Sequence, residues 1–125
     1  MPAARNPMHW FEIPVKDLER AQTFYESLLG VELNPARLGP YKMAWFPVTQ
    51  GCPGAPGALV QAEGYVPSHS GTLVYLSVED IEATLAKLPS LGGRILMQKR
   101  GIGEHGFIAH FEDCEGNRVA LHAKK

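Results

Sequence analysis

An internal repeat constrains the fold of this chain more than any other feature of its sequence. The segment IPVKDLERA at residues 13–21 resembles LSVEDIEAT at residues 76–84, which begins 63 residues later in a chain of 125. Self-similarity at a fixed offset is the sequence signature of a repeated structural unit. We therefore predict two copies of one unit, at about residues 7–64 and 70–123.

A strand and then a helix are expected to open each copy. The runs HWFEIPV (residues 9–15) and TLVYLSV (residues 72–78) are rich in β-branched and aromatic residues, which favour strands. Asp17 and Asp80 follow these runs, and an aspartate at this position can accept hydrogen bonds from the unpaired N–H groups at a helix start. In the first copy, apolar residues then recur at helical spacing as far as Gly30, which suits the left-handed residue that ends a helix.

Three short strands are expected to follow each helix. Their predicted ranges are residues 31–34, 42–49 and 57–63 in the first copy and residues 94–98, 106–112 and 117–123 in the second. Pro89 is expected to end the regular part of the second helix, because proline lacks the N–H that a helix interior needs. The order predicts an α+β fold of two tandem βαβββ modules in a single domain, residues 1–125.

Composition excludes several classes of protein. The chain is 45% hydrophobic and 20% charged with a net charge of −1, which is typical of a soluble globular protein. It has no basic stripe for nucleic acid and no apolar run long enough to span a bilayer, so neither partner is expected. Cys52 and Cys114 lie far apart without CxxC spacing, and the first ten residues lack a signal-peptide core. We therefore expect a reducing, cytoplasmic setting.

Three segments carry a resemblance to a known family. They are FEIPVKDLERAQTFYESLLG (residues 11–30), YLSVEDIEATLAKL (residues 75–88) and FEDCEGNRVAL (residues 111–121). In this order they resemble the vicinal oxygen chelate superfamily, which includes glyoxalase I, bleomycin-resistance proteins and extradiol dioxygenases. The resemblance implies curled mixed sheets around an open cavity, a small-molecule ligand and, for small chains, a homodimer. The nearest branch is that of glyoxalase-like proteins without an assigned reaction.

The metal-dependent members of this superfamily carry four ligands, usually His and Glu, on the first and last strand of each module. Matching the repeat and its glycines places these four positions at Trp10, Gln61, Leu73 and Ala120. None of these side chains is a good ligand for a divalent ion, since Gln61 offers only a weak oxygen donor. The resemblance therefore implies a member that lacks the usual metal and any other cofactor, unless a divalent metal binds at a displaced position.

The same cavity face continues two residues further along each strand, because side chains alternate. The residues there are Glu12, Glu63, Tyr75 and His122, which suit general acid–base chemistry or a displaced metal site. Structural roles compete with this interpretation: a solvated strand end for Glu63 and His122, an ion pair for Glu12, and a cavity wall for Tyr75. Trp10 is either a core residue or a stacking platform for a ligand.

The other histidines and the cysteine of the last turn give weaker signals. His9 alternates away from the cavity face, His69 and His105 lie in loops, and the partners of His110 in its strand are not evident. Cys114 lies beside two acidic residues that should raise the pKa of its thiol, which makes it a poor nucleophile.

Two functional hypotheses follow, and a third is weaker. The first is a small-molecule-binding protein that lacks the family's metal. The second is a lyase or isomerase that uses Glu12, Tyr75 and His122 as acid–base groups or as a displaced metal site. The third is a partner protein whose cavity is filled by side chains. Under the first hypothesis we predict that His122 lines the cavity, with Glu12, Tyr75 or a ligand as its hydrogen-bond partner.

Overall fold

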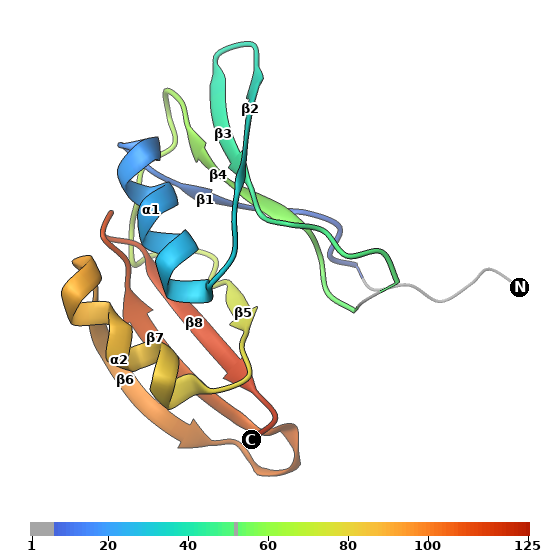
Figure 1. Cartoon of the computed structure of the whole chain (residues 1–125), viewed down its shortest axis with the longest axis vertical. Coiled ribbons are helices and arrows are strands. Elements are labelled where there is room, and N and C mark those ends of the chain that lie inside the picture. Colours follow the sequence, from blue (N-terminus) through green and yellow to red (C-terminus); the bar gives the residue numbers. More distant parts are fainter. Residues whose placement is uncertain (1–6, 52) are drawn as a thin grey trace, which may run out of the picture.

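Each copy of the repeat forms a strand, a helix and three further strands in the computed structural model, which describes residues 7–51 and 53–125 (Figure 1). The first module consists of β1 (Phe11–Pro14), α1 (Leu18–Leu29), β2 (Asn34–Leu38), β3 (Tyr41–Trp45) and β4 (Gly57–Gln61). The second consists of β5 (Tyr75–Ser77), α2 (Ile81–Leu91), β6 (Arg94–Gly101), β7 (Phe107–Glu112) and β8 (Arg118–Ala123), with a short 3₁₀ helix (Gly103–His105) before β7. The predicted α+β fold of two βαβββ modules is confirmed.

The strands form two four-stranded mixed sheets, which are not closed. The first sheet has the order β1-β4-β3-β2 and the second the order β5-β8-β7-β6. In each module the opening strand pairs in parallel with the closing strand, so that Glu12 lies opposite Ala58 and Tyr75 lies opposite Ala120. The remaining pairs are antiparallel. The two sheets therefore repeat the same topology, with equivalent registers in the parallel pairs, while the β6–β7 pair also contains register shifts.

Both helices begin as the repeat predicts. The Asp17 carboxylate accepts a hydrogen bond from the Arg20 N–H at 3.2 Å, and the Asp80 carboxylate accepts one from the Ala83 N–H at 3.0 Å. Such bonds satisfy N–H groups that have no partner within the helix. The two predicted N-caps are confirmed.

The helix ends agree with the prediction in one module only. Gly30 ends α1 with a left-handed φ of 68°, as expected. The expectation that Pro89 ends the second helix is wrong, because α2 continues to Leu91 and ends at Gly92 with a φ of 89°. A proline in the last turn removes only one main-chain hydrogen bond, so the helix continues for two residues beyond Pro89 before it ends.

The second strand of the first module also differs from its prediction. β2 covers Asn34–Leu38 and includes Pro35, whereas the sequence indicated residues 31–34. β2 lies at the edge of the first sheet, where a residue without an N–H group is tolerated. Proline therefore does not mark the end of the strand here.

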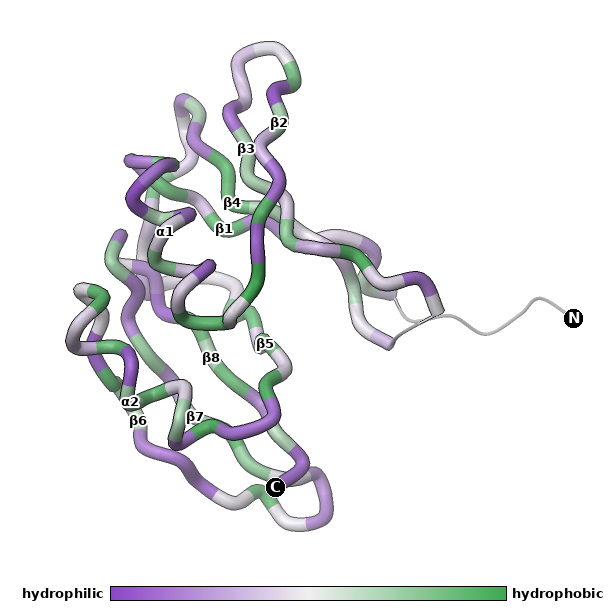
Figure 2. The backbone as a smooth tube through the Cα atoms, viewed as in Figure 1, coloured by the Kyte–Doolittle hydropathy of each residue, from purple (hydrophilic) through white to green (hydrophobic). Residues whose placement is uncertain are grey.

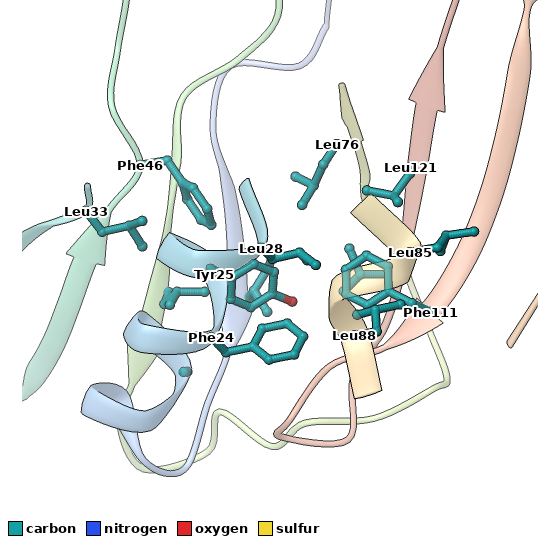
Figure 3. Packing of buried hydrophobic residues seen from close by; sticks show 14 of the residues in the cluster. Phe24, Tyr25, Leu28, Leu33, Phe46, Leu76, Leu85, Leu88, Phe111 and Leu121 are labelled. Atoms are coloured by element: carbon teal, nitrogen blue, oxygen red, sulfur yellow. The ribbon is translucent and has the colours of Figure 1, made fainter. Parts of the chain in front are cut away.

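A single hydrophobic core holds the helices between the two sheets. Figure 3 shows α1 and α2 side by side, with strands of the first sheet beyond α1 and strands of the second sheet beyond α2. Phe24 and Tyr25 of α1 both approach Phe111 of β7, with ring centroids at 6.3 and 6.5 Å. Each sheet therefore packs one face against the helices and turns its other face away from them.

The hydropathy of each strand follows its place within its sheet. In Figure 2 the inner strands β4 and β8 are largely hydrophobic, whereas much of the edge strand β6 is hydrophilic. The main core draws on both helices and both sheets. Within the described residues, neither helix has the length and apolar character needed to cross a membrane.

Candidate functional site

Aromatic side chains gather on the face of the first sheet that points away from α1. Ile13 belongs to the core on the α1 side, so Glu12 before it points to the opposite side. That outer face has its own small cluster, in which Met43, Ala58 and Val60 are buried beneath partly buried neighbours that include Trp10, Trp45 and Tyr65. We call this surface the aromatic face; it comprises Trp10, Glu12, Tyr41, Met43, Trp45, Ala58, Val60 and Tyr65.

The carboxylate of Glu12 is held by neighbouring aromatic side chains. The Trp10 Nε1–H donates to one carboxylate oxygen at 3.1 Å, and the Tyr65 hydroxyl donates to the other at 2.9 Å. Trp10 contacts Trp45 edge to face with ring centroids 5.2 Å apart, and Tyr41 contacts Tyr65 in the same way at 5.9 Å. The hydrogen bond to Glu12 raises the pKa of Tyr65, so this hydroxyl stays a donor at neutral pH. Glu12 itself is exposed to solvent.

The outer face of the second sheet carries polar and basic side chains. The Arg118 Nε–H donates to Nδ1 of His110 at 3.0 Å, and the Tyr75 hydroxyl lies 3.5 Å from Nε2 of the same ring. Because a guanidinium can only donate, Nδ1 accepts and Nε2 carries the proton of the neutral imidazole. Burial, followed by the charges of Arg118 and Arg100, lowers the pKa of His110 and favours this neutral form.

An ion-pair network borders this second face. Glu112 accepts a hydrogen bond from Arg94 at 2.9 Å and lies 2.7 Å from Nε2 of His69. The hydrogen bond from Arg94 is the main reason why the pKa of Glu112 is lowered. The acidic group of this face therefore already has a cationic partner in Arg94.

His122 lies on the outer face of the second sheet, but its partner differs from the prediction. Its Nε2 donates to the main-chain carbonyl of His105 at 2.6 Å. The expected bond to Glu12 or Tyr75 is wrong within one chain, because Glu12 belongs to the other sheet and Tyr75 contacts His110 instead. The side chain is half-buried, and its other ring nitrogen remains unprotonated when the ring is neutral.

The sequence interpretation of the last strand of the first module is wrong by three residues. Gln61 faces α1, where its Oε1 accepts a hydrogen bond from the Leu18 N–H at 2.9 Å, and Glu63 lies in an exposed turn. The pairing of β1 with β4 instead places Ala58 in the register that Ala120 occupies in the second module. Val60 correspondingly takes the position expected for Glu63.

Two glycines explain this error. The prediction matched Gly57 to Gly116 as equivalent turn residues. Gly116 does lie in a turn with a φ of 95°, but Gly57 lies inside β4, where a Cβ atom would approach the Phe11 ring to 2.3 Å. Gly116 is needed because its backbone has a positive φ, whereas Gly57 is needed because a side chain there would clash with Phe11. The two glycines therefore do not mark equivalent positions of the repeat.

The residues at the four family metal positions do not fit a metal ion. When Ala58 replaces Gln61, the positions that the family resemblance assigns are Trp10, Ala58, Leu73 and Ala120, of which the strand pairing supports Ala58 as the counterpart of Ala120. Alkyl side chains and an indole N–H supply no lone pair for a divalent cation. Among residues 7–51 and 53–125, no group of three or more His, Cys, Asp or Glu side chains is arranged to hold a metal.

The predicted second layer does not converge within one chain. Glu12 lies on the outer face of the first sheet, whereas Tyr75 and His122 lie on the outer face of the second, with the helices between the sheets. Trp10 lies beside Glu12, and the methyl group of Ala120 is fully buried beneath the second face.

Leu73 borders a different space. It lines a cavity of about 1020 Å³ between the helix ends, β5 and the loop before β4, together with Phe11, Leu28, Phe46 and Leu76. The lining is mainly apolar, with the charged residues Glu79, Asp80 and Lys87 beside the start of α2 and along it.

Several residues of these faces were not singled out by sequence. Trp45 and Met43 share a face by the alternation in YKMAW, so that pattern could have added them to the site. The contacts of Tyr65 and Arg118 join segments far apart in the chain, and no local signal reveals them. The expectation for Cys114 is confirmed, since burial and the neighbouring Asp113 and Glu115 raise the pKa of its thiol to about 11.

Comparison with known proteins agrees with this architecture. The family model of the glyoxalase/bleomycin resistance protein/dioxygenase superfamily matches residues 8–121. A glyoxylase-like domain-containing protein of Didymella fabae is 32% identical over 119 residues, which cover 88% of each chain.

Two solved structures show the same fold. A glyoxylase/bleomycin resistance protein/dioxygenase domain from Frankia superposes with a TM-score of 0.73 at 16% identity and covers 98% of this chain and all of that one. Glyoxalase I from Zea mays superposes with a TM-score of 0.66 at 26% identity over 94% of this chain, which spans only 46% of the maize protein. The chain therefore belongs to the glyoxalase/bleomycin resistance protein/dioxygenase superfamily.

Proposed function

We propose that this protein binds a small organic molecule against its aromatic face, without the metal that other members of the superfamily use. The observation that carries the proposal is the cluster around Glu12, in which Trp10, Trp45, Tyr41 and Tyr65 surround a fixed carboxylate. Ligand sites in proteins are mostly apolar and aromatic, with a few well-placed polar groups. The replacement of the metal positions by Trp and alkyl side chains supports a binding role.

The proposal includes a homodimer in which the second sheet of a partner covers the aromatic face. The two outer faces lie on opposite sides of the helices, so a site that uses both requires a second copy. Tyr41 on one face is 40% exposed and Tyr75 on the other is 48% exposed, and large exposed side chains on a sheet face mark interaction surfaces.

We also propose a cytoplasmic setting, with neither nucleic acid nor membrane as a partner. The chain has only two cysteines, Cys52 and Cys114, far apart in the sequence, and it therefore lacks the disulfide framework that is typical of small secreted domains. The net charge of −1, with basic residues scattered along the chain, supports a small molecule rather than nucleic acid as the ligand.

Ligand-observed NMR with a library of heteroaromatic fragments tests the binding role. In saturation-transfer experiments on protein dialysed against a chelator, fragments should receive magnetisation from the wild type and lose it in Trp10→Ala. Thr23→Ala is the control, because Thr23 is exposed on α1, outside both the aromatic face and the cavity that Leu73 lines. Binding that requires added metal, or that survives Trp10→Ala unchanged, would contradict the proposal.

One observation favours the lyase or isomerase hypothesis as a second candidate. The His105 carbonyl fixes the proton of neutral His122 on Nε2, which leaves Nδ1 with a lone pair that can accept a proton as a general base. A base of this kind would catalyse deuterium incorporation from D₂O into the carbon next to the carbonyl of an α-hydroxy ketone. Incorporation that is lost in His122→Gln would support this candidate, and no incorporation above the protein-free rate would exclude that exchange.

A further inference from the structure

We propose that the molecule held at the aromatic face carries an organic cation, a protonated or quaternary amine, which binds between Glu12 and the surrounding rings. This inference rests on the proposed binding function and names the chemical class of the ligand. It follows from the charge and partners of Glu12 and from the electrostatics of the rings around it.

Glu12 differs from the other carboxylates of the outer faces in having only neutral partners. Its two donors are the Trp10 indole and the Tyr65 hydroxyl. In the part of the chain that the structure describes, Glu112 pairs with Arg94 and His69, whereas no Lys, Arg or His forms an ion pair with Glu12. Neutral donors fix the position of a carboxylate but leave its full negative charge in place.

The aromatic rings around Glu12 favour the same sign of charge in a ligand. The faces of Trp and Tyr rings carry negative electrostatic potential and attract cations, with Trp the strongest. In an edge-to-face pair such as Trp10 and Trp45, the ring that presents its edge covers only one face of its neighbour and keeps both of its own faces free of that neighbour. Since Glu12 is exposed, an ammonium group can reach it from solvent and contact these rings at the same time.

An unused hydrogen-bond donor lies on the same face. The Nε1–H of Trp45 is buried and has no acceptor among the described residues. Buried donors normally have a partner, and one without a partner calls for an explanation. This atom is out of reach of solvent, so the choice of probe rests on the cation alone, and choline supplies a quaternary ammonium group for Glu12 and the rings.

Intrinsic fluorescence reports directly on this face. The sequence contains two tryptophans, and both Trp10 and Trp45 belong to the aromatic face. Titration with choline should change the emission saturably, and its neutral isostere 3,3-dimethyl-1-butanol should bind about tenfold or more weakly. Glu12→Gln removes the charge and leaves one oxygen acceptor in place of two, while the rings stay in place. This variant should therefore lose most of the preference for choline and keep only the part that the rings contribute. Glu32→Gln, an exposed carboxylate outside the face, should retain the preference.

Three results would overturn the proposal. Equal affinity of the wild type for choline and the isostere would show an apolar site, and the binding function would then still stand. No saturable response to choline would exclude the cation class, while the fragment experiment would decide the binding function separately. Dissociation of a dimer by Glu12→Gln, measured by sedimentation velocity, would show that Glu12 pairs with an arginine of a second copy instead of a ligand.

Discussion

Two carboxylates in this protein show how environment separates a structural role from a binding role. Asp113 is only 2% exposed, and its oxygens accept hydrogen bonds from the Tyr25 hydroxyl at 2.6 Å and from the side chain and main chain of Asn117. Glu12 is exposed, has two neutral donors and keeps room for a further partner. A buried carboxylate needs its partners to offset desolvation, whereas an exposed one can exchange solvent for a ligand.

Removal of the Tyr25 hydroxyl tests the structural role at residue scale. Tyr25→Phe keeps the packing of a fully buried ring but deprives Asp113 of one donor. Because hydrogen bonds to charged groups contribute about 1.5–3 kcal/mol, the free energy of unfolding should fall by that amount in urea denaturation. Tyr41→Phe, at a ring that is 40% exposed, is the control and should change it by less than about 0.5 kcal/mol. Equal effects of the two variants would contradict this role.

The titration of His110 gives a second prediction at this scale. Burial and the charges of Arg118 and Arg100 lower its pKa, so the unfolded chain binds the proton more readily than the folded protein. The stabilising contribution is therefore present above the unfolded pKa of about 6.5 and is lost as the pH falls from there through the lower folded value. NMR titration of the imidazole should give a pKa below 6.5, and His110→Gln should weaken the loss of stability between pH 7.5 and 5. A His110 pKa above 6.5 would contradict the placement of its imidazole beside Arg118 and Arg100.

At the scale of elements, the turn between β7 and β8 fastens the second module to the first. Glu115 accepts hydrogen bonds from the main-chain N–H groups of Lys16 and Asp17 and pairs with Arg20, all at the junction of β1 and α1. Asn117 donates to the Pro14 carbonyl at 2.7 Å. The turn of one module thereby positions the strand that carries Glu12 in the other.

Asn117 provides the test of this connection. Asn117 is 4% exposed, and Asn117→Ala removes the donor to the Pro14 carbonyl and the acceptor of the Ser68 N–H. It also deprives the buried carboxylate of Asp113 of a donor. We expect a loss of about 2–4 kcal/mol in the free energy of unfolding, measured by chemical denaturation. Asn34→Ala, at an exposed position of the edge strand β2, should change stability little. A small effect of Asn117→Ala would show that the modules hold together without this turn.

The sequence predicted correctly those structural features that depend on residues close together in the chain. The caps at Asp17 and Asp80 involve atoms three residues apart, and the repeat made the order of elements visible. The register of β4 was missed, because Gly57 has a packing role that its sequence context does not reveal. The partner of His122 was missed as well, since the position of the helices between the sheets depends on contacts far apart in the chain.

At the scale of the whole molecule, the metal positions lead to a testable expectation. Trp10, Ala58, Leu73 and Ala120 supply no ligand for a divalent ion, so purified protein should contain well under one equivalent of transition metal by mass spectrometry. Added Zn²⁺, Ni²⁺, Mn²⁺ or Fe²⁺ should bind weakly, and His122→Ala should not change this. Stoichiometric, tight metal that is lost in His122→Ala would contradict the metal-free site and favour a displaced one.

The helix layer separates the two outer faces, so the complete site is proposed to form between two copies. The tryptophan indoles on the first sheet of one copy should then lie close to the second sheet of its partner. Ser77 is exposed on the outer face of the second sheet, where it lies opposite His122. Thr23 is exposed on α1 and offers a control position away from that face.

Intermolecular paramagnetic relaxation measures this proximity directly. A spin label on Ser77→Cys, in an unlabelled chain whose two native cysteines are replaced by serine, is mixed with ¹⁵N-labelled wild type. The indole signals of Trp10 and Trp45 should broaden with the label at residue 77 and remain sharp with the label on Thr23→Cys. Sharp indole signals in both mixtures, together with a monomeric mass by sedimentation, would contradict the shared site.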